Sequence, residues 1–214
     1  STQSAAPTQA PREAAPAPPF AHLRLHTEFS IRDGLVSVGP MVKRLAEQDY
    51  CSVAITDLNN LFGLIKFYTA ALSSGVKPLC GCDVPVRSEN SDTVSPVVLL
   101  AMNEVGYRNM TRLISAMYTD GNTSGELELA QEKLRGNSEG LIALSGAQFG
   151  DVGAALLNGE RELAGALLQT WLELFPGRFY LEVQRVGRSG EEDYIDAVLE
   201  LAAEASVPVV ATND

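Results

Sequence analysis

Acidic and imidazole side chains follow or interrupt several short apolar runs in this sequence. His26 and Asp57 each come directly after such a run, and Glu182 lies inside another. In α/β folds, functional side chains collect at the rim where the strands end. Carboxylates and imidazoles gathered there bind divalent cations or pair with arginine, because such charges are costly to bury alone. The pattern therefore suggests the hypothesis that these side chains once bound, or still bind, metal ions.

Two further carboxylates extend this set. Asp83 follows Leu79-Cys80-Gly81-Cys82, and Asp214 ends the chain after Val209–Asn213. Each residue alone has an ordinary structural explanation, because an Asp after a strand is often a turn residue or a helix N-cap. A lone His is more often a hydrogen-bonded structural residue than a ligand. The set, and not any one member, carries the hypothesis.

Seven short runs are predicted to be the strands that position these side chains. They are Ala21–Leu25, Ser52–Thr56, Pro78–Val86, Val97–Ala101, Leu141–Leu144, Phe179–Val183 and Pro208–Thr212. Amphipathic helical patterns alternate with them. Strands alternating with helices predict an α/β fold with a parallel sheet and helices outside it. A closed barrel and an open doubly wound sheet both fit this pattern.

Four helical faces are predicted from the apolar spacing. They comprise Val42, Leu45 and Ala46 after Pro40; Leu61, Leu64, Ile65, Tyr68 and Leu72; Leu163, Leu167, Trp171 and Leu174, ended by Pro176-Gly177; and Ile195, Val198, Leu199 and Ala202. No exposed helix face stands out as a docking site.

Composition favours one main domain. The chain has 214 residues and is 45% hydrophobic, which is enough for one sizeable core. Residues 1–19 are rich in Ala and Pro and are predicted to be a disordered arm before a domain at 20–214. No run of apolar residues is long enough to span a membrane, and no secretory signal is visible.

The cysteines favour a reducing compartment. Three of them, Cys51, Cys80 and Cys82, form an odd set that argues against a disulfide framework. We therefore expect a cytoplasmic protein. The one-residue spacing of Cys80 and Cys82 matches neither a zinc ribbon nor a redox pair, so we interpret them as buried thiols beside a tight turn.

The charge balance argues against a surface that grips DNA. Net charge is −11, with 27 Asp and Glu against 16 Lys and Arg. Proteins bind DNA phosphates through clustered basic residues, because affinity comes largely from counterion release. No such cluster is present, so little direct DNA binding is expected. The acidic stretch Glu126–Glu132 is interpreted as a solvated helix face.

One long stretch carries a family resemblance. Residues 20–34 read Phe-Ala-His-Leu-Arg-Leu-His-Thr-Glu-Phe-Ser-Ile-Arg-Asp-Gly. This resembles the opening motif of the PHP (polymerase and histidinol phosphatase) domain, and within that superfamily it is similar to bacterial DNA polymerase III alpha subunits. Further matching pieces follow in order across the rest of the chain: 54–57, 61–68, 75–78, 99–103, 106–109, 141–146 and 209–214.

The resemblance implies the fold and the parent function. It implies a (β/α)7-like PHP barrel, truncated at its C-terminal end, that opens a much longer DNA-directed DNA polymerase acting in DNA replication. The palm, fingers and clamp-binding regions, with the polymerase's magnesium, would lie outside this sequence. The proofreading exonuclease (epsilon) subunit and the rest of the replicative holoenzyme are the implied partners.

Active members of the family hold a cluster of metal ions, often zinc or manganese, on histidines and carboxylates. Four positions here match that pattern: Asp33, Asp57, Glu182 and Asp214. Others depart from it. Of the first His-x-His pair only His26 remains, with Arg24 in place of the other member, while Leu58 replaces a His and Asp83 a Glu.

These departures favour a vestigial site without a catalytic residue. The chain has two histidines, His22 and His26, and on one strand they would lie about 13 Å apart, too far to share a metal. Arg24 between them puts a permanent positive charge where a cation would sit. The sequence therefore predicts a non-catalytic structural and partner-docking domain, in which Arg24 neutralises the carboxylates. A residual zinc- or manganese-dependent phosphoesterase or 3'-5' exonuclease is the alternative, and an α/β module unrelated to replication is another.

Overall fold

The computed structural model describes residues 20–89, 93–120 and 126–213. The predicted arm at 1–19 and the candidate site residue Asp214 lie outside the described residues. Helices and strands alternate along most of the chain. The strands are β1 (Ser52–Ile55), β2 (Lys77–Arg87), β3 (Val94–Ala101), β4 (Leu129–Ala130), β5 (Leu141–Leu144), β6 (Phe179–Val183) and β7 (Val209–Ala211). The α-helices are α1 (Val38–Glu47), α2 (Leu64–Ser73), α3 (Glu104–Thr119), α4 (Asp151–Leu157), α5 (Arg161–Leu174) and α6 (Glu191–Ala205), with 3-10 turns η1 (Gln131–Leu134) and η2 (Ala147–Phe149).

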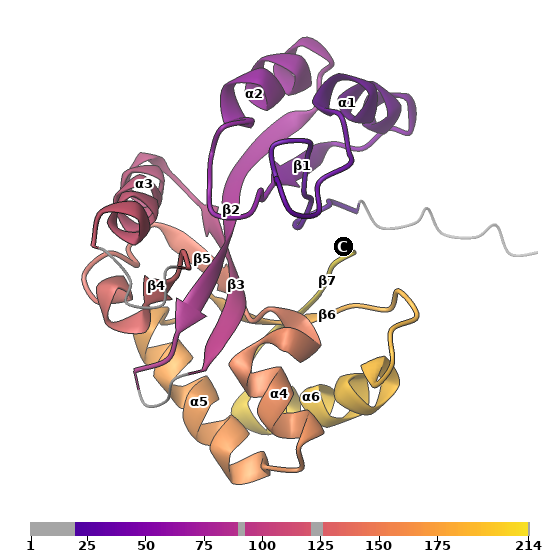
Figure 1. The fold of residues 1–214 in the computed structure, drawn as a ribbon. Coiled ribbons are helices and arrows are strands. Elements are labelled where there is room, and N and C mark those ends of the chain that lie inside the picture. The colour runs from indigo at the N-terminus through magenta and orange to yellow at the C-terminus, as the bar shows by residue number, and fades with distance from the viewer. Residues whose placement is uncertain (1–19, 90–92, 121–125, 214) are drawn as a thin grey trace, which may run out of the picture.

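The strands form one curled sheet with the character of a half barrel (Figure 1). Among the described residues the order is β1-β2-β3-β5-β6-β7, and β4 pairs with β2. The pairs β1–β2, β5–β6 and β6–β7 are parallel, whereas β3 runs antiparallel to both of its neighbours. The prediction of an α/β fold is confirmed, and the expected all-parallel sheet is corrected at β3, because β2 and β3 follow each other without a helix between them.

Local signals in the sequence explain several element ends. The side chain of Asn103 caps α3 by accepting a hydrogen bond from the backbone N–H of Gly106. Acidic residues fill the first turn of α6, where their negative charges interact favourably with the positive end of the helix dipole. Helix α5 ends at Leu174, just before Pro176, because proline cannot continue the hydrogen-bond ladder.

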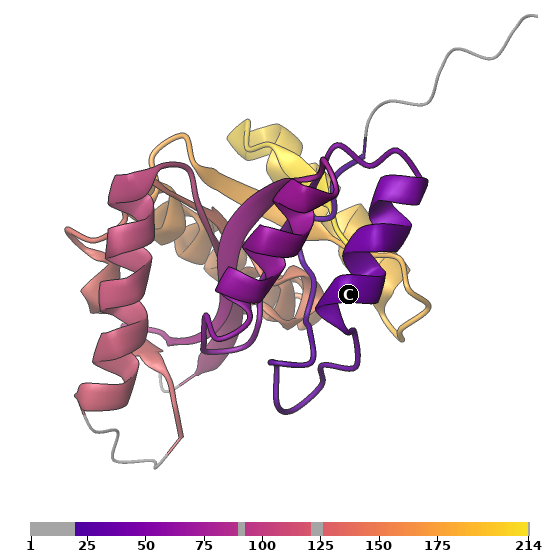
Figure 2. The ribbon, with the colours of Figure 1, turned by 90° about the horizontal axis from the view of Figure 1, so that it is seen from above.

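The helices lie outside the sheet, and the main core fills the space between them (Figures 1 and 2). In that core the ring of Trp171 on α5 stacks on Phe179 of β6. A second core packs α1 and α2 against β1, around Phe67. A third, smaller cluster lies on the inner face of the sheet and includes Ala54, Val98, Leu100 and Leu144. Among the described residues, no helix has both the length and the apolar character needed to cross a membrane.

The first predicted strand is wrong in form but close in position. Ala21–Leu25 makes only an isolated parallel bridge, between His22 and Val53. The backbone nevertheless runs beside β1, because the N–H groups of Ala54 and Thr56 donate to the carbonyls of His22 and Leu25. Leu25 also donates its N–H to the Thr56 hydroxyl. This segment therefore extends the sheet next to β1 without being a regular strand.

The predicted helix faces are partly wrong. In α2 the buried residues are Leu64, Phe67 and Ala71, whereas Ile65, Tyr68 and Leu72 are exposed. The predicted face thus combined buried and exposed residues of a helix that is apolar on nearly all sides. In α5, Leu163 is exposed and Ala164 and Leu168 are buried instead, although Trp171 and Leu174 are buried as predicted. In α6, Ile195, Val198 and Ala202 are buried as predicted and Leu199 is exposed.

Two further interpretations of short motifs are corrected. Cys80 and Cys82 lie in the continuous strand β2 and not beside a tight turn, although all three cysteines are free as expected. The stretch Glu126–Glu132 is not a solvated helix face. It contains β4 and the start of η1, and Glu128 is buried, where it accepts two hydrogen bonds from the Arg87 guanidinium at 2.7 and 2.5 Å.

Candidate functional site

Arg24 is the centre of the cluster of charged residues predicted from the sequence. Its guanidinium is buried and donates from Nη2 to Oδ2 of Asp83 at 2.5 Å. Nη1 lies 3.4 Å from both carboxylate oxygens of Glu182. Asp83 comes from β2 and Glu182 from β6, and β3 and β5 lie between these two strands in the sheet. The Arg24 guanidinium therefore connects the segment beside β1 to two strands that are far apart in the sequence.

His26 adds a second link between carboxylates. Its Nδ1 lies 3.0 Å from Oδ2 of Asp33, and its Nε2 lies 3.2 Å from Oδ2 of Asp83. A ring with both nitrogens facing carboxylates is best satisfied as the imidazolium, which donates from both. Burial lowers the pKa of His26, but the hydrogen bond and charge of Asp83 and the charge of Asp33 outweigh it, so the pKa is raised overall.

Asp57 is the second residue after β1 and is held by hydrogen bonds from Thr27. Its carboxylate accepts from the backbone N–H of Thr27 at 2.6 Å and from the Thr27 hydroxyl at 2.8–2.9 Å. Burial raises the pKa of Asp57, and the hydrogen bonds from Thr27 only partly offset this effect. Asp57 thus anchors the segment that carries Arg24 and His26.

A buried polar network surrounds Glu182, whose side chain is fully buried. Its Oε1 accepts from the Thr212 hydroxyl at 2.5 Å and from Nε2 of Gln184 at 3.3 Å. Its backbone N–H donates to the hydroxyl of Ser145, and its carbonyl accepts from the Tyr194 hydroxyl. The hydrogen bonds from Thr212 and Gln184 help to satisfy the buried carboxylate, which would otherwise be costly to bury.

The structure brings most of the predicted site residues together. Arg24, His26, Asp33, Asp83 and Glu182 are joined by ion pairs. Leu58 lies next to them through a parallel bridge with Asp83, but it brings no ligand atom in its side chain. His22 lies apart, stacked on the Tyr50 ring at 5.2 Å between centroids.

Sequence reasoning missed the neutral residues that hold the site in place. These are Thr27, Ser30, Ser145, Gln184 and Thr212. Ser30 donates to Oδ1 of Asp33 and accepts from the backbone N–H of Leu58, which closes the turn. A signal was available for Gln184, because it follows Glu182 by two residues and so faces the same side of the sheet.

These residues do not fit the metal cluster that the fold family implies. Such a cluster needs several neutral imidazoles and free carboxylates around each cation. Here a guanidinium stands between Asp83 and Glu182, and the one imidazole is held between two carboxylates. Within the described parts of the chain, no group of three or more candidate ligands could hold a metal ion.

Comparison with solved structures gives the fold. The chain superposes on an amidohydrolase from Chromobacterium violaceum, solved with bound sulfate and no metal, at a TM-score of 0.60 and 15% identity, covering 91% of this chain and 86% of that one. It also superposes on a two-domain protein from Bacteroides vulgatus that contains a predicted PHP-like metal-dependent phosphoesterase, at a TM-score of 0.53 and 10% identity, covering 91% of this chain and 51% of that one. At these identities the likeness shows the fold alone, which agrees with the expected barrel type.

Sequence comparison identifies much closer relatives. The chain is 48% identical over 196 residues to the DNA polymerase III subunit alpha of Pseudomonas aeruginosa, and 42% identical over 198 residues to that of Escherichia coli K12. The alignments cover 91% and 92% of this chain but 17% of each relative, so the chain spans about a sixth of their length. The PHP domain family matches residues 22–186. The chain therefore belongs to the PHP domain family, with the alpha subunits of bacterial DNA polymerase III among its relatives.

Proposed function

We propose that this chain is the N-terminal PHP domain of a bacterial DNA polymerase III alpha subunit, and that it acts there as a non-catalytic structural and partner-docking domain. The parent would be a cytoplasmic DNA-directed DNA polymerase that uses magnesium at a palm domain outside this chain. Identity of 42–48% over nine-tenths of the chain supports this parentage.

The position of Arg24 is the single observation that carries the non-catalytic role. A hydrolytic PHP site needs its carboxylates free to coordinate cations and activate water. In this chain the Arg24 guanidinium forms ion pairs with Asp83 and Glu182, and His26 forms ion pairs with Asp33 and Asp83. On this proposal Arg24, His26, Asp33, Asp57, Leu58, Asp83, Glu182 and Asp214 are vestigial metal-site positions.

The same geometry supports a structural role. Arg24 links the segment beside β1 to β2 and β6, so the ion pairs close the mouth of the curled sheet that metals would close in an active relative. Buried ion pairs of this kind hold an arrangement in register, and removing one partner leaves the others uncompensated. The proofreading exonuclease subunit is the partner we propose for this domain in the holoenzyme.

A residual metal-dependent phosphoesterase or 3'-5' exonuclease is the second candidate. It is favoured by the observation that His26, Asp57, Asp83 and Glu182 still lie around one mouth. The test is hydrolysis of p-nitrophenyl phosphate and of a 3'-labelled oligonucleotide by the purified chain in zinc, manganese or magnesium. We expect no turnover above the protein-free control. Metal-dependent turnover that is lost in Asp83→Asn would establish the second candidate instead.

A further inference from the structure

A small hollow lies at the mouth of the curled sheet, beside the charged site. Its volume is about 470 Å³. The apolar part of its wall consists of Leu25, Leu35 and Val36, which belong to the segment before α1. Asn213, the last described residue, lines the same hollow. The hollow therefore lies where the described chain leaves the sheet.

The turn that carries Leu35 holds several apolar side chains in solvent. Ile31, Leu35 and Val36 are 87%, 95% and 39% exposed, and we call these three residues the apolar turn. The turn is closed by its own hydrogen bonds, among them one from the Gly34 N–H to the Ser30 carbonyl at 2.7 Å. Single exposed apolar residues are ordinary, but several gathered on one closed turn mark a contact surface that is already ordered before contact.

Hydrogen bonds fix the point at which the chain leaves β7. The backbone N–H of Thr212 donates to the carbonyl of Val183 at 3.0 Å, and its hydroxyl donates to Oε1 of Glu182 at 2.5 Å. Thr212 is thereby held at the mouth of the sheet, and Asn213 follows it into the lining of the hollow. Figures 1 and 2 show the chain leaving β7 toward the indigo segment that precedes α1.

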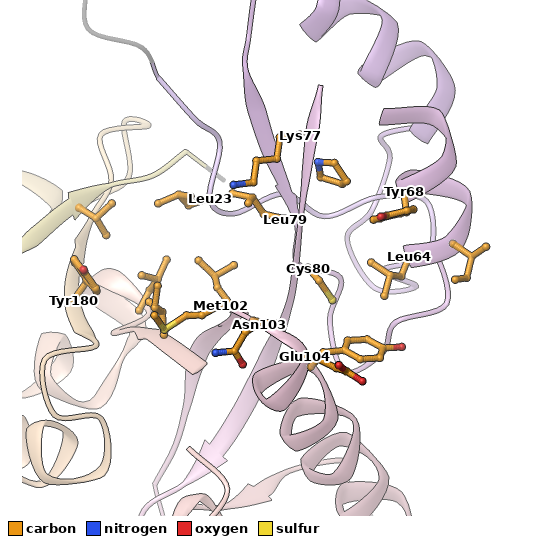
Figure 3. A pocket seen from close by; sticks show the side chains of 18 of the residues that line it. Leu23, Leu64, Tyr68, Lys77, Leu79, Cys80, Met102, Asn103, Glu104 and Tyr180 are labelled. Atoms are coloured by element: carbon orange, nitrogen blue, oxygen red, sulfur yellow. The ribbon is translucent and has the colours of Figure 1, made fainter. Parts of the chain in front are cut away.

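A larger apolar cavity, of about 1100 Å³, lies at the other end of the sheet, where β2 and β7 begin (Figure 3). Leu79 of β2 and the first two residues of β7, Val209 and Val210, contribute to its lining. Strand β7 runs away from that cavity toward Asn213. The residues after Asp214 therefore start beside the smaller hollow and not beside the larger cavity.

Length and reach favour a segment of the same chain as the occupant. The polymerase relatives are about six times as long as the stretch that they share with this chain. A round hollow of 470 Å³ is about 10 Å across, and three or four residues of extended chain span roughly 10–14 Å. A segment tethered at the hollow also has a far higher effective concentration there than a second copy or a separate protein.

We infer that the apolar turn is the packing site for the residues that directly follow Asp214 in the parent chain. An apolar side chain of that segment fills the hollow against Leu35 and Val36. Arg24 and His26 also line the hollow, so the segment removes water from them and strengthens their ion pairs. This inference rests on the proposed function for the existence of the longer chain.

The test compares the accessibility of position 35 in the 214-residue chain and in the full-length parent. Leu35→Cys is made in both proteins, and its alkylation by N-ethylmaleimide is followed by mass spectrometry of the peptide that contains position 35. Burying one apolar side chain shifts an equilibrium between open and closed forms by about tenfold or more. Labelling at position 35 should therefore be slower by that factor in the full-length protein.

Leu163→Cys is the matched control, since Leu163 is 48% exposed on α5 and lies outside the hollow. Its labelling rate should be the same in both proteins. Because Leu35 is almost fully exposed, Leu35→Cys should leave the melting temperature of the 214-residue chain unchanged, and circular dichroism checks that it does. Equal labelling rates at position 35 in the two proteins would overturn the inference and leave the proposed function intact.

A second measurement identifies the occupant. A benzoylphenylalanine photo-crosslinker at position 35 of the full-length parent should capture a peptide within about the first ten residues after Asp214. A crosslink to a distant part of the parent, to a second copy or to another protein would overturn the inference. If the gene continues into no polymerase, the proposed function fails, while the labelling comparison still tests the packing of the segment that follows Asp214.

Discussion

Replacing Arg24 with alanine leaves the buried carboxylate of Glu182 without a counter-ion and leaves Asp83 with His26 alone. The Arg24 side chain is 7% exposed, and those of Asp83 and Glu182 are 2% and 0% exposed. Removing one partner of a buried ion pair costs about 3–5 kcal/mol, because the remaining charges stay buried. For a domain of this size each kcal/mol corresponds to about 2–4 °C in melting temperature, so we expect a loss of roughly 6–20 °C.

Arg161→Ala is the control on the surface. Arg161 also contacts two carboxylates, Glu200 and Glu204 at 3.4 and 2.6 Å, but its side chain is 43% exposed. Exposed pairs contribute about 0–1 kcal/mol, so its melting temperature should change by at most a few degrees. The assay is thermal and urea unfolding followed by circular dichroism at neutral pH.

A double variant separates lost charge compensation from lost packing. In Arg24→Ala with Glu182→Gln, the uncompensated buried charge of Glu182 is removed, so the double variant should be more stable than Arg24→Ala alone. Equal melting temperatures for Arg24→Ala and Arg161→Ala would refute this reasoning. So would a double variant less stable than Arg24→Ala, since the free energy cost would then come from lost contacts.

Three further predictions follow from the site, the turn that supports it and the overall charge. The folded-state pKa of His26 is raised, so its contribution to stability is fully present below pH about 6.5 and is lost as pH rises through the folded-state pKa. The pKa of His22 is lowered by burial, so His22 makes the protein less stable at low pH, and this destabilisation disappears as pH rises. Urea unfolding is measured between pH 5.5 and 8.5. His26→Gln should remove the fall in the free energy of unfolding with rising pH, and His22→Gln should make that fall steeper. The same slope in the unmodified chain and both variants would contradict this. Gly34→Ala should destabilise the turn before α1, because the added Cβ would lie 1.7 Å from the carbonyl oxygen of Thr27. Gly39→Ala in α1 meets nothing within 4 Å and should stabilise the protein by about 0.5–1 kcal/mol. Thermal melts in which Gly34→Ala is the more stable of the two would contradict this prediction. The chain alone should extend no primed template and bind a primed oligonucleotide weakly by fluorescence anisotropy, and tight binding that falls steeply with salt would argue against its docking role.

The sequence predicted the strands better than the helix faces, for a physical reason. Leu141–Leu144 and Phe179–Val183 are continuous apolar or alternating runs bounded by polar or turn residues, and both strands have the predicted bounds. In α2, Ile65 and Phe67 are equally apolar, and nothing local decides which side meets the sheet. Only the packing of the folded domain buries Phe67 and exposes Ile65.

The site shows a similar division. The alternation of strands and helices predicted that Asp83 and Glu182 converge, because strand ends meet at one rim, and the family resemblance added Arg24 to this set. The hydrogen bonds that hold them were not predictable. Thr27 and Thr212 become site residues only because the fold brings their hydroxyls within reach of Asp57 and Glu182. Short-range spacing carries no information about such long-range contacts.

Metal titration of the unmodified chain tests the central claim most directly, namely that Arg24 and not a metal ion balances the carboxylates of this PHP site. Zinc and manganese are titrated separately into purified, chelator-treated protein by isothermal calorimetry, with melting temperatures recorded for the same samples. The account predicts no stoichiometric binding at micromolar metal and an unchanged melting temperature. One or more equivalents of either metal bound at micromolar affinity, with a rise in melting temperature that is lost in Asp83→Asn, would contradict it.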